Sequence, residues 1–185
     1  MLMHVNQARR IALLGVMAAI STVFLLLGTV IPVNTVFFTS AAAFLTGISL
    51  VLYGPGYGFA FYAACSALDF MLNPMPLHVF LYLVLAGYTL FAELTWRWLG
   101  KMAPGKKKDW LHRGIRFALF LILYVPLIWF APGLFITVDR VDFAWYFPLL
   151  AAGIIGWVVF DFAYALCKRF IWKHFQSIWK EKERE

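Results

Sequence analysis

Three carboxyl groups lie within long apolar segments of this 185-residue sequence, at Asp69, Glu93 and Asp161. Ionisable side chains are costly inside a membrane, so those that occur there commonly carry function. Asp69 and Asn73 are four residues apart, which places both side chains on one face of a helix. Glu93 has Arg97 at the same spacing, and this pair favours a structural ion pair instead.

One kind of catalysis is compatible with these acids. Asp69 and Asp161 could form an aspartyl pair, in which one protonated carboxyl acts as an acid while the other activates water. Their positions place Asp69 and Asp161 in opposite halves of the bilayer, which argues against the pair. The sequence contains no HExxH, GxSxG, phosphate-binding glycine loop or CxxC motif. A small intramembrane enzyme that uses Asp69, His78 or Asp161 remains an alternative.

A second group of polar and aromatic residues lies in and beside three short connections between apolar segments. Polar groups among aromatic side chains are typical of a small-molecule site, and these connections are predicted to open on one side of the membrane. Solvated loops flanked by interfacial aromatic anchors are the structural alternative. The predicted substrate-binding residues are Asn34, Thr35, Asp69, Asn73, His78, Tyr82, Asp139, Arg140 and Tyr146.

The elements that must position these residues are membrane spans. The sequence is 63% hydrophobic and 14% charged, with a mean hydropathy of +0.80. A soluble domain of this composition would expose too much apolar surface, whereas in a bilayer the same surface faces lipid. We therefore predict an all-α integral membrane protein with a single domain of six transmembrane helices. The predicted spans are about 11–31, 36–53, 57–72, 77–98, 115–135 and 145–166, followed by a basic amphipathic tail at 167–185.

The distribution of Lys and Arg predicts the orientation. With six spans, 15 of the 16 basic residues fall on one side and Arg140 falls on the other. Basic residues concentrate on the cytoplasmic side of membrane proteins, so both termini are predicted to be cytoplasmic. The stretch Gly100 to Gly114 is expected to be the one real loop. The net charge of +7 indicates this topology and attraction to anionic lipid, not nucleic-acid binding.

The first apolar segment carries a row of small residues. Ala8, Ala12, Gly15 and Ala19 follow one another at spacings of four, three and four, so they share one face of a helix. Small residues let helix backbones approach closely in a membrane. The row predicts a partner-docking face, with ordinary packing inside the bundle as the alternative. Cys65 and Cys167 have no histidine partners, so neither a metal nor another cofactor is expected.

A glycine-rich hairpin completes the pattern. Phe44-Leu45-Thr46-Gly47 precedes Tyr53-Gly54-Pro55-Gly56-Tyr57-Gly58, whose Gly and Pro residues favour a tight turn between two helices. With the AxxxA spacing of the first segment and six predicted spans, this FLxG…YGPxxG hairpin resembles the substrate-binding S component of an energy-coupling-factor transporter. The motifs cover residues 8–70, and the rest of the resemblance is one of topology.

The resemblance implies a binding and transport subunit that is not an enzyme. S components are multi-pass proteins of the prokaryotic plasma membrane that capture a vitamin-like solute from outside with high affinity. They deliver it to a transmembrane T component driven by two cytoplasmic ATPases, with docking through the small residues of the first helix. These correspond here to Ala8 and Ala12, followed by Gly15 and Ala19. A small membrane scaffold without a pocket is the third alternative.

Overall fold

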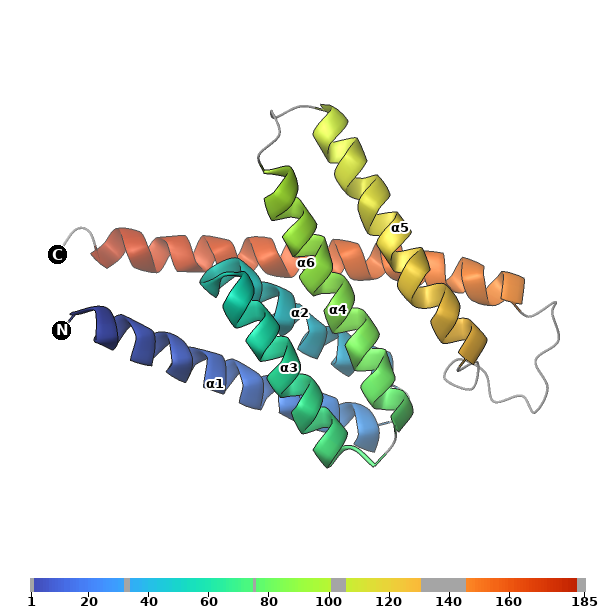
Figure 1. Cartoon of the computed structure of the whole chain (residues 1–185), viewed down its shortest axis with the longest axis horizontal. Coiled ribbons are helices and arrows are strands. Elements are labelled where there is room, and N and C mark those ends of the chain that lie inside the picture. The colour runs from blue at the N-terminus through green and yellow to red at the C-terminus, as the bar shows by residue number, and fades with distance from the viewer. Residues whose placement is uncertain (1, 32–33, 75, 101–105, 131–145, 183–185) are drawn as a thin grey trace. The chain divides into compact units, whose positions relative to one another are not determined.

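The computed structural model describes residues 2–31, 34–74, 76–100, 106–130 and 146–182. Within these ranges the chain is entirely helical, with no strand. The chain divides into two compact units, Met1–Val138 and Asp139–Glu185. The first unit holds five helices and the second holds one (Figure 1). The helices are α1 (Leu2–Val30), α2 (Thr35–Tyr53), α3 (Pro55–Leu72), α4 (Pro76–Leu99), α5 (Lys106–Phe130) and α6 (Tyr146–Lys182).

Four of these helices are long and apolar enough to cross a membrane. They contain the segments Gln7–Val30, Thr35–Tyr53, His78–Leu99 and Phe147–Phe170. Each coincides with a segment that hydropathy alone predicts, and together they indicate a multi-pass membrane protein. The two other predicted spans, 57–72 and 115–135, fall on α3 and on α5, although residues 131–135 lie outside the described ranges.

The hairpin between α2 and α3 forms where the glycine-rich sequence predicts it. Gly54 separates the two helices with a φ of +102°, a backbone conformation that side chains disfavour. Its N–H donates to Leu50 O at 3.0 Å and so satisfies a carbonyl at the end of α2. Pro55 then begins α3 at the first helical position, where its missing N–H costs nothing.

Helix α2 lies at the centre of the first unit and packs against α1, α3 and α4. Small side chains make this possible, since Ala42 and Ala43 are fully buried. Helix α3 approaches α2 closely at Gly58, where an added Cβ would lie 2.6 Å from Leu50 Cβ. Helix α5 packs against α4.

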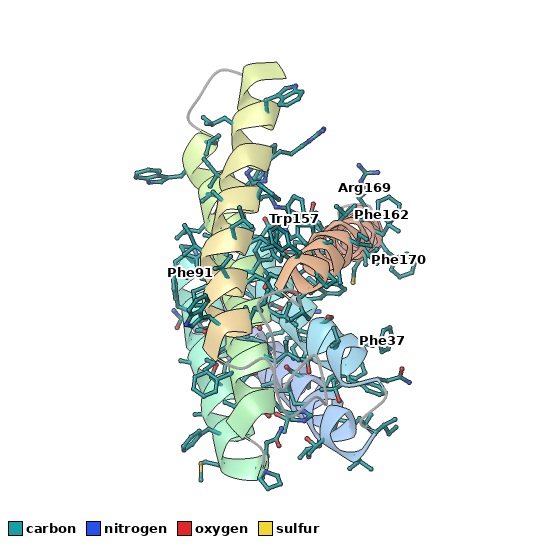
Figure 2. The ribbon with its side chains drawn as sticks, turned by 90° about the vertical axis from the view of Figure 1, so that its right-hand side faces the viewer. Phe37, Phe91, Trp157, Phe162, Arg169 and Phe170 are labelled. Atoms are coloured by element: carbon teal, nitrogen blue, oxygen red, sulfur yellow. The ribbon has the colours of Figure 1, made fainter. Side chains whose placement is uncertain are left out.

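Large apolar side chains cover the outside of the helices. Phe37 of α2 is 68% exposed, and Phe162 and Phe170 of α6 are similarly exposed. Figure 2 shows these three rings projecting away from their helices. Apolar side chains at this density would cause aggregation in water, whereas lipid solvates them.

The structure corrects one predicted loop and extends two helices. The stretch Gly100 to Gly114 was expected to be a loop, but α5 begins at Lys106 and runs through Gly114. Lysines and a single glycine do not stop a helix, because a glycine costs only about 1 kcal/mol relative to alanine. Helix α1 begins at Leu2, before the predicted start at 11. The predicted tail continues α6 as one helix as far as Lys182.

Candidate functional site

Asp69 and Asn73 are in contact, as their spacing predicts. Asp69 lies in the last turn of α3 and is 2% exposed, and Asn73 is the C-cap of the helix and is 7% exposed. Asn73 Nδ2 donates to Asp69 Oδ1 at 3.3 Å, and the Asn73 N–H donates to Asp69 O at 2.8 Å. The end of α3 therefore carries a carboxyl and an amide that are both withdrawn from solvent.

The second carboxylate oxygen of Asp69 is unsatisfied. Asp69 Oδ2 is buried and has no hydrogen-bond partner among the described residues. His78, half-buried at the start of α4, interacts electrostatically with this carboxyl. An acceptor buried without a donor costs about 1–3 kcal/mol, so native structures nearly always supply a partner. Asp69, Asn73 and His78 are three of the predicted site residues, and the structure brings them together.

Tyr82, another predicted site residue, lies in the interior of the first unit. It is fully buried on α4, and its hydroxyl forms a 3.0 Å hydrogen bond with Thr46 Oγ1 on α2. Cys65 of α3 and Ser21 of α1 lie beside the Tyr82 hydroxyl. Ser21 Oγ makes no hydrogen bond within the described part of the chain. One polar side chain from each of α1 to α4 thus meets at Tyr82.

Asn34 and Thr35 lie where α1 ends and α2 begins. Asn34 is exposed and precedes α2 without a side-chain capping bond. The Thr35 hydroxyl donates to Gly28 O at 2.8 Å, so it satisfies a carbonyl near the end of α1. Figure 1 shows the end of α1 and the start of α2 at the same end of the first unit as the end of α3 and the start of α4. Asn34, Thr35, Asp69, Asn73 and His78 therefore lie at one end of the first unit, whereas Tyr82 lies in its interior.

The remaining predicted residues belong to the second unit or lie outside the described ranges. Asp139 and Arg140 are outside them. Tyr146 begins α6, and the structure does not describe its side chain. Asp161 is half-buried within α6. The pairing of Asp69 with Asp161 in an enzyme therefore stays a prediction, as does a pocket that includes Asp139, Arg140 and Tyr146.

Two contacts were not predicted from the sequence. The first is the Thr46–Tyr82 hydrogen bond. The second joins Arg97 of α4 to the C-terminal end of α2. Arg97 Nη2 donates to Leu50 O at 2.7 Å and to Val51 O at 3.1 Å. Both carbonyls lie in the last turn of α2; Leu50 O also accepts the Gly54 N–H, whereas Val51 O lies beyond the last backbone donor of the helix. A cation near the end of an apolar span is a signal for such a contact, but it does not identify the partner.

The predicted docking face on α1 is open. Ala8, Ala12, Gly15 and Ala19 are all exposed, and a Cβ added to Gly15 would meet nothing within 4 Å. Helix α1 packs through other residues, chiefly Ser21, Leu25 and Gly28 in its second half. The small-residue face is therefore not used for packing within the first unit.

Within the described residues there is no group of three or more His, Cys, Asp or Glu side chains that could hold a metal ion. Cys65 and Cys167 are free thiols, the first buried and the second half-buried. Comparison of the chain with protein-family models, with curated proteins and with solved structures found no match. The interpretation of the site therefore depends on its own chemistry.

Proposed function

We propose that this chain captures a small polar solute at one membrane face and passes it to an ATP-driven transport complex. The observation that carries the proposal is the buried carboxyl of Asp69, which has an unsatisfied oxygen at the end of a helical unit. A polar group held in this state inside a membrane protein is costly, and ligand binding is the common reason for retaining it. Asn73 and His78 beside it supply further polar groups for orienting a solute.

The topology that this function needs has six spans and cytoplasmic termini. Helix α3 connects α2 to α4 and packs against both. If α2 and α4 cross the membrane in the same direction, α3 must cross it in the opposite direction. The 15 basic residues on one predicted side support the orientation. In this orientation Asp69, Asn73 and His78 lie near the outer face of a plasma membrane. The solute would then enter from outside.

The uncovered row of small residues on α1 supports a partner helix. Ala12 and Gly15 expose little apolar area to lipid, whereas they let another helix backbone approach closely. A transmembrane partner driven by two cytoplasmic ATPases would use this face, as the resemblance to the S components of energy-coupling-factor transporters implies. In this assembly the chain binds the solute, and its partners hydrolyse ATP.

The docking step is tested by a bulky substitution on the small-residue face. We expect Ala12→Trp to abolish solute uptake and co-purification with the ATPase partners, because the indole keeps the partner backbone away. Solute binding should remain, since Ala12 is exposed and on a different helix from Asp69. The measurement is mass spectrometry of both the proteins and the small molecules that co-purify from membranes.

The matched control is Leu13→Trp. Leu13 is an exposed apolar residue of the same helix, and it lies more than a quarter of a turn away from Ala12. This variant should keep both uptake and co-purification. Unchanged co-purification of the Ala12→Trp variant with a membrane partner and ATPases would show that the face is not a docking surface.

A further inference from the structure

The chemistry around Asp69 restricts the group that can complete this site. Asp69 is 2% exposed, and one of its oxygens receives a hydrogen bond of 3.3 Å from the neutral Asn73 amide. The other oxygen receives none from the described residues. A carboxylate removed from water is stabilised by good hydrogen bonds to its oxygens and by a nearby positive charge. One neutral bond to one oxygen leaves this requirement unmet.

No Lys or Arg side chain in the described part of the first unit donates a hydrogen bond to Asp69 Oδ2. His78 is the neighbour that acts electrostatically on Asp69, but it makes no hydrogen bond to Oδ2. Arg97 donates to Leu50 O and Val51 O at the C-terminal end of α2, whereas His78 lies at the start of α4. The described residues therefore leave Oδ2 without a donor, and a cationic N–H group would supply that donor together with further positive charge.

We propose that a positively charged nitrogen of the solute donates a hydrogen bond to Asp69 Oδ2. This inference rests on the proposed capture of a solute, and it names the chemical class of that solute. An N–H group carrying the charge satisfies both needs at once, because charge-assisted hydrogen bonds to carboxylates are short and about twice as strong as neutral ones. Asn73 then holds Oδ1 in place while Oδ2 receives the cation.

The depth of Asp69 limits the shape of the cationic group. Asp69 lies one helical turn, about 6 Å, from Asn73 at the end of α3. A primary ammonium or a planar amidinium is small and offers N–H donors. A quaternary ammonium offers no donor, so it leaves Oδ2 unsatisfied. The site therefore selects small N–H cations over neutral amides and over quaternary ammonium ions.

The test uses three small probes on the detergent-purified full chain. Acetamidinium and acetamide have nearly the same planar shape and differ in charge, and tetramethylammonium is a cation without a donor. We expect acetamidinium to bind at least about tenfold more tightly than either of the others, as measured by the concentration that raises the melting temperature. A tenfold preference corresponds to about 1.4 kcal/mol, within the range for hydrogen bonds to charged groups.

Two variants test whether Asp69 is responsible for the preference for acetamidinium. Asp69→Asn keeps the shape of the side chain and removes its charge, so the preference for acetamidinium should disappear. Asp161→Asn makes the same change in α6 and should leave the preference intact. Equal binding of acetamidinium and acetamide by the unmodified chain would overturn the proposal, and so would binding of neither, which would leave a water molecule as the partner of Oδ2. These outcomes do not depend on the folding of a variant.

The outcome is separable from that of the transport proposal. Acetamidinium binding by a chain that never co-purifies with ATPases would support the cation site and contradict the transport function. ATPase-dependent uptake of a neutral or anionic solute, unaffected by Asp69→Asn, would support transport and contradict the cation site.

Discussion

Gly58 gives the sharpest test of how the first unit is packed. It is the last glycine of the YGPxxG motif, and it lies where α3 closely approaches Leu50 of α2. A Cβ at this position would lie 2.6 Å from Leu50 Cβ and 2.9 Å from Leu50 Cα, whereas ordinary contacts are 3.4–4 Å. The Leu50 backbone cannot rotate away as a side chain would, so the two helices must separate by about 1 Å. Overpacking of this kind costs about 1–3 kcal/mol.

The matched control is two residues away in the same helix. Gly56 is the second residue of α3, and an added Cβ there would meet nothing within 4 Å. Both Gly→Ala changes gain the same helix propensity, about 1 kcal/mol, so this contribution cancels in a comparison. We therefore expect Gly58→Ala to be less stable than Gly56→Ala by about 1–3 kcal/mol.

The free energy of unfolding can be measured by titrating the purified chain with SDS in mixed micelles and following its helical circular dichroism. Equal midpoints for Gly58→Ala and Gly56→Ala would refute the reasoning, because they would mean that α2 and α3 are not in close contact at this turn. A Gly58→Ala variant with a lower midpoint and unchanged helix content would support it. The glycine would then be required for packing and not only for the turn.

Two further predictions concern the contacts that hold α4. Tyr82→Phe should lower the free energy of unfolding by about 1–2 kcal/mol, because Thr46 Oγ1 loses its buried partner. Adding Thr46→Val should recover part of that loss, which a double-mutant cycle measures. Additive losses from the two mutations would contradict the hydrogen bond. Arg97→Gln should lower stability by about 1 kcal/mol, since its bonds to Leu50 O and Val51 O are lost from an exposed guanidinium. No shift in the SDS midpoint for Arg97→Gln would show that water replaces both bonds.

Local spacing predicted part of the candidate site. Asp69 and Asn73 are hydrogen-bonded as expected, because residues four apart on a helix are always neighbours. Their joint burial with His78 beside them is also consistent with the predicted set. Thr46 was not predicted, because its partner Tyr82 is 36 residues away on another helix. Contact between helices depends on their register, and no short-range pattern specifies it.

The sequence by itself determined the solvent and the elements of this protein. Runs of about 20 apolar residues dictate helices in a bilayer, since no other open backbone satisfies its polar groups there. Four such helices are present with nearly the predicted bounds. The Gly54-Pro55 turn also followed from local chemistry, because glycine tolerates the φ of +102° and proline can begin a helix.

The tertiary structure alone decided which polar groups of different helices are paired. Lipid and protein interior are equally apolar, so hydropathy does not distinguish a lipid-facing side chain from a buried one. Only the packing of α1 to α4 shows that Tyr82 reaches Thr46 and that the small face of α1 stays uncovered. The same packing leaves Asp69 Oδ2 without a donor in the described chain, because burial removes water and no neighbouring helix supplies a replacement.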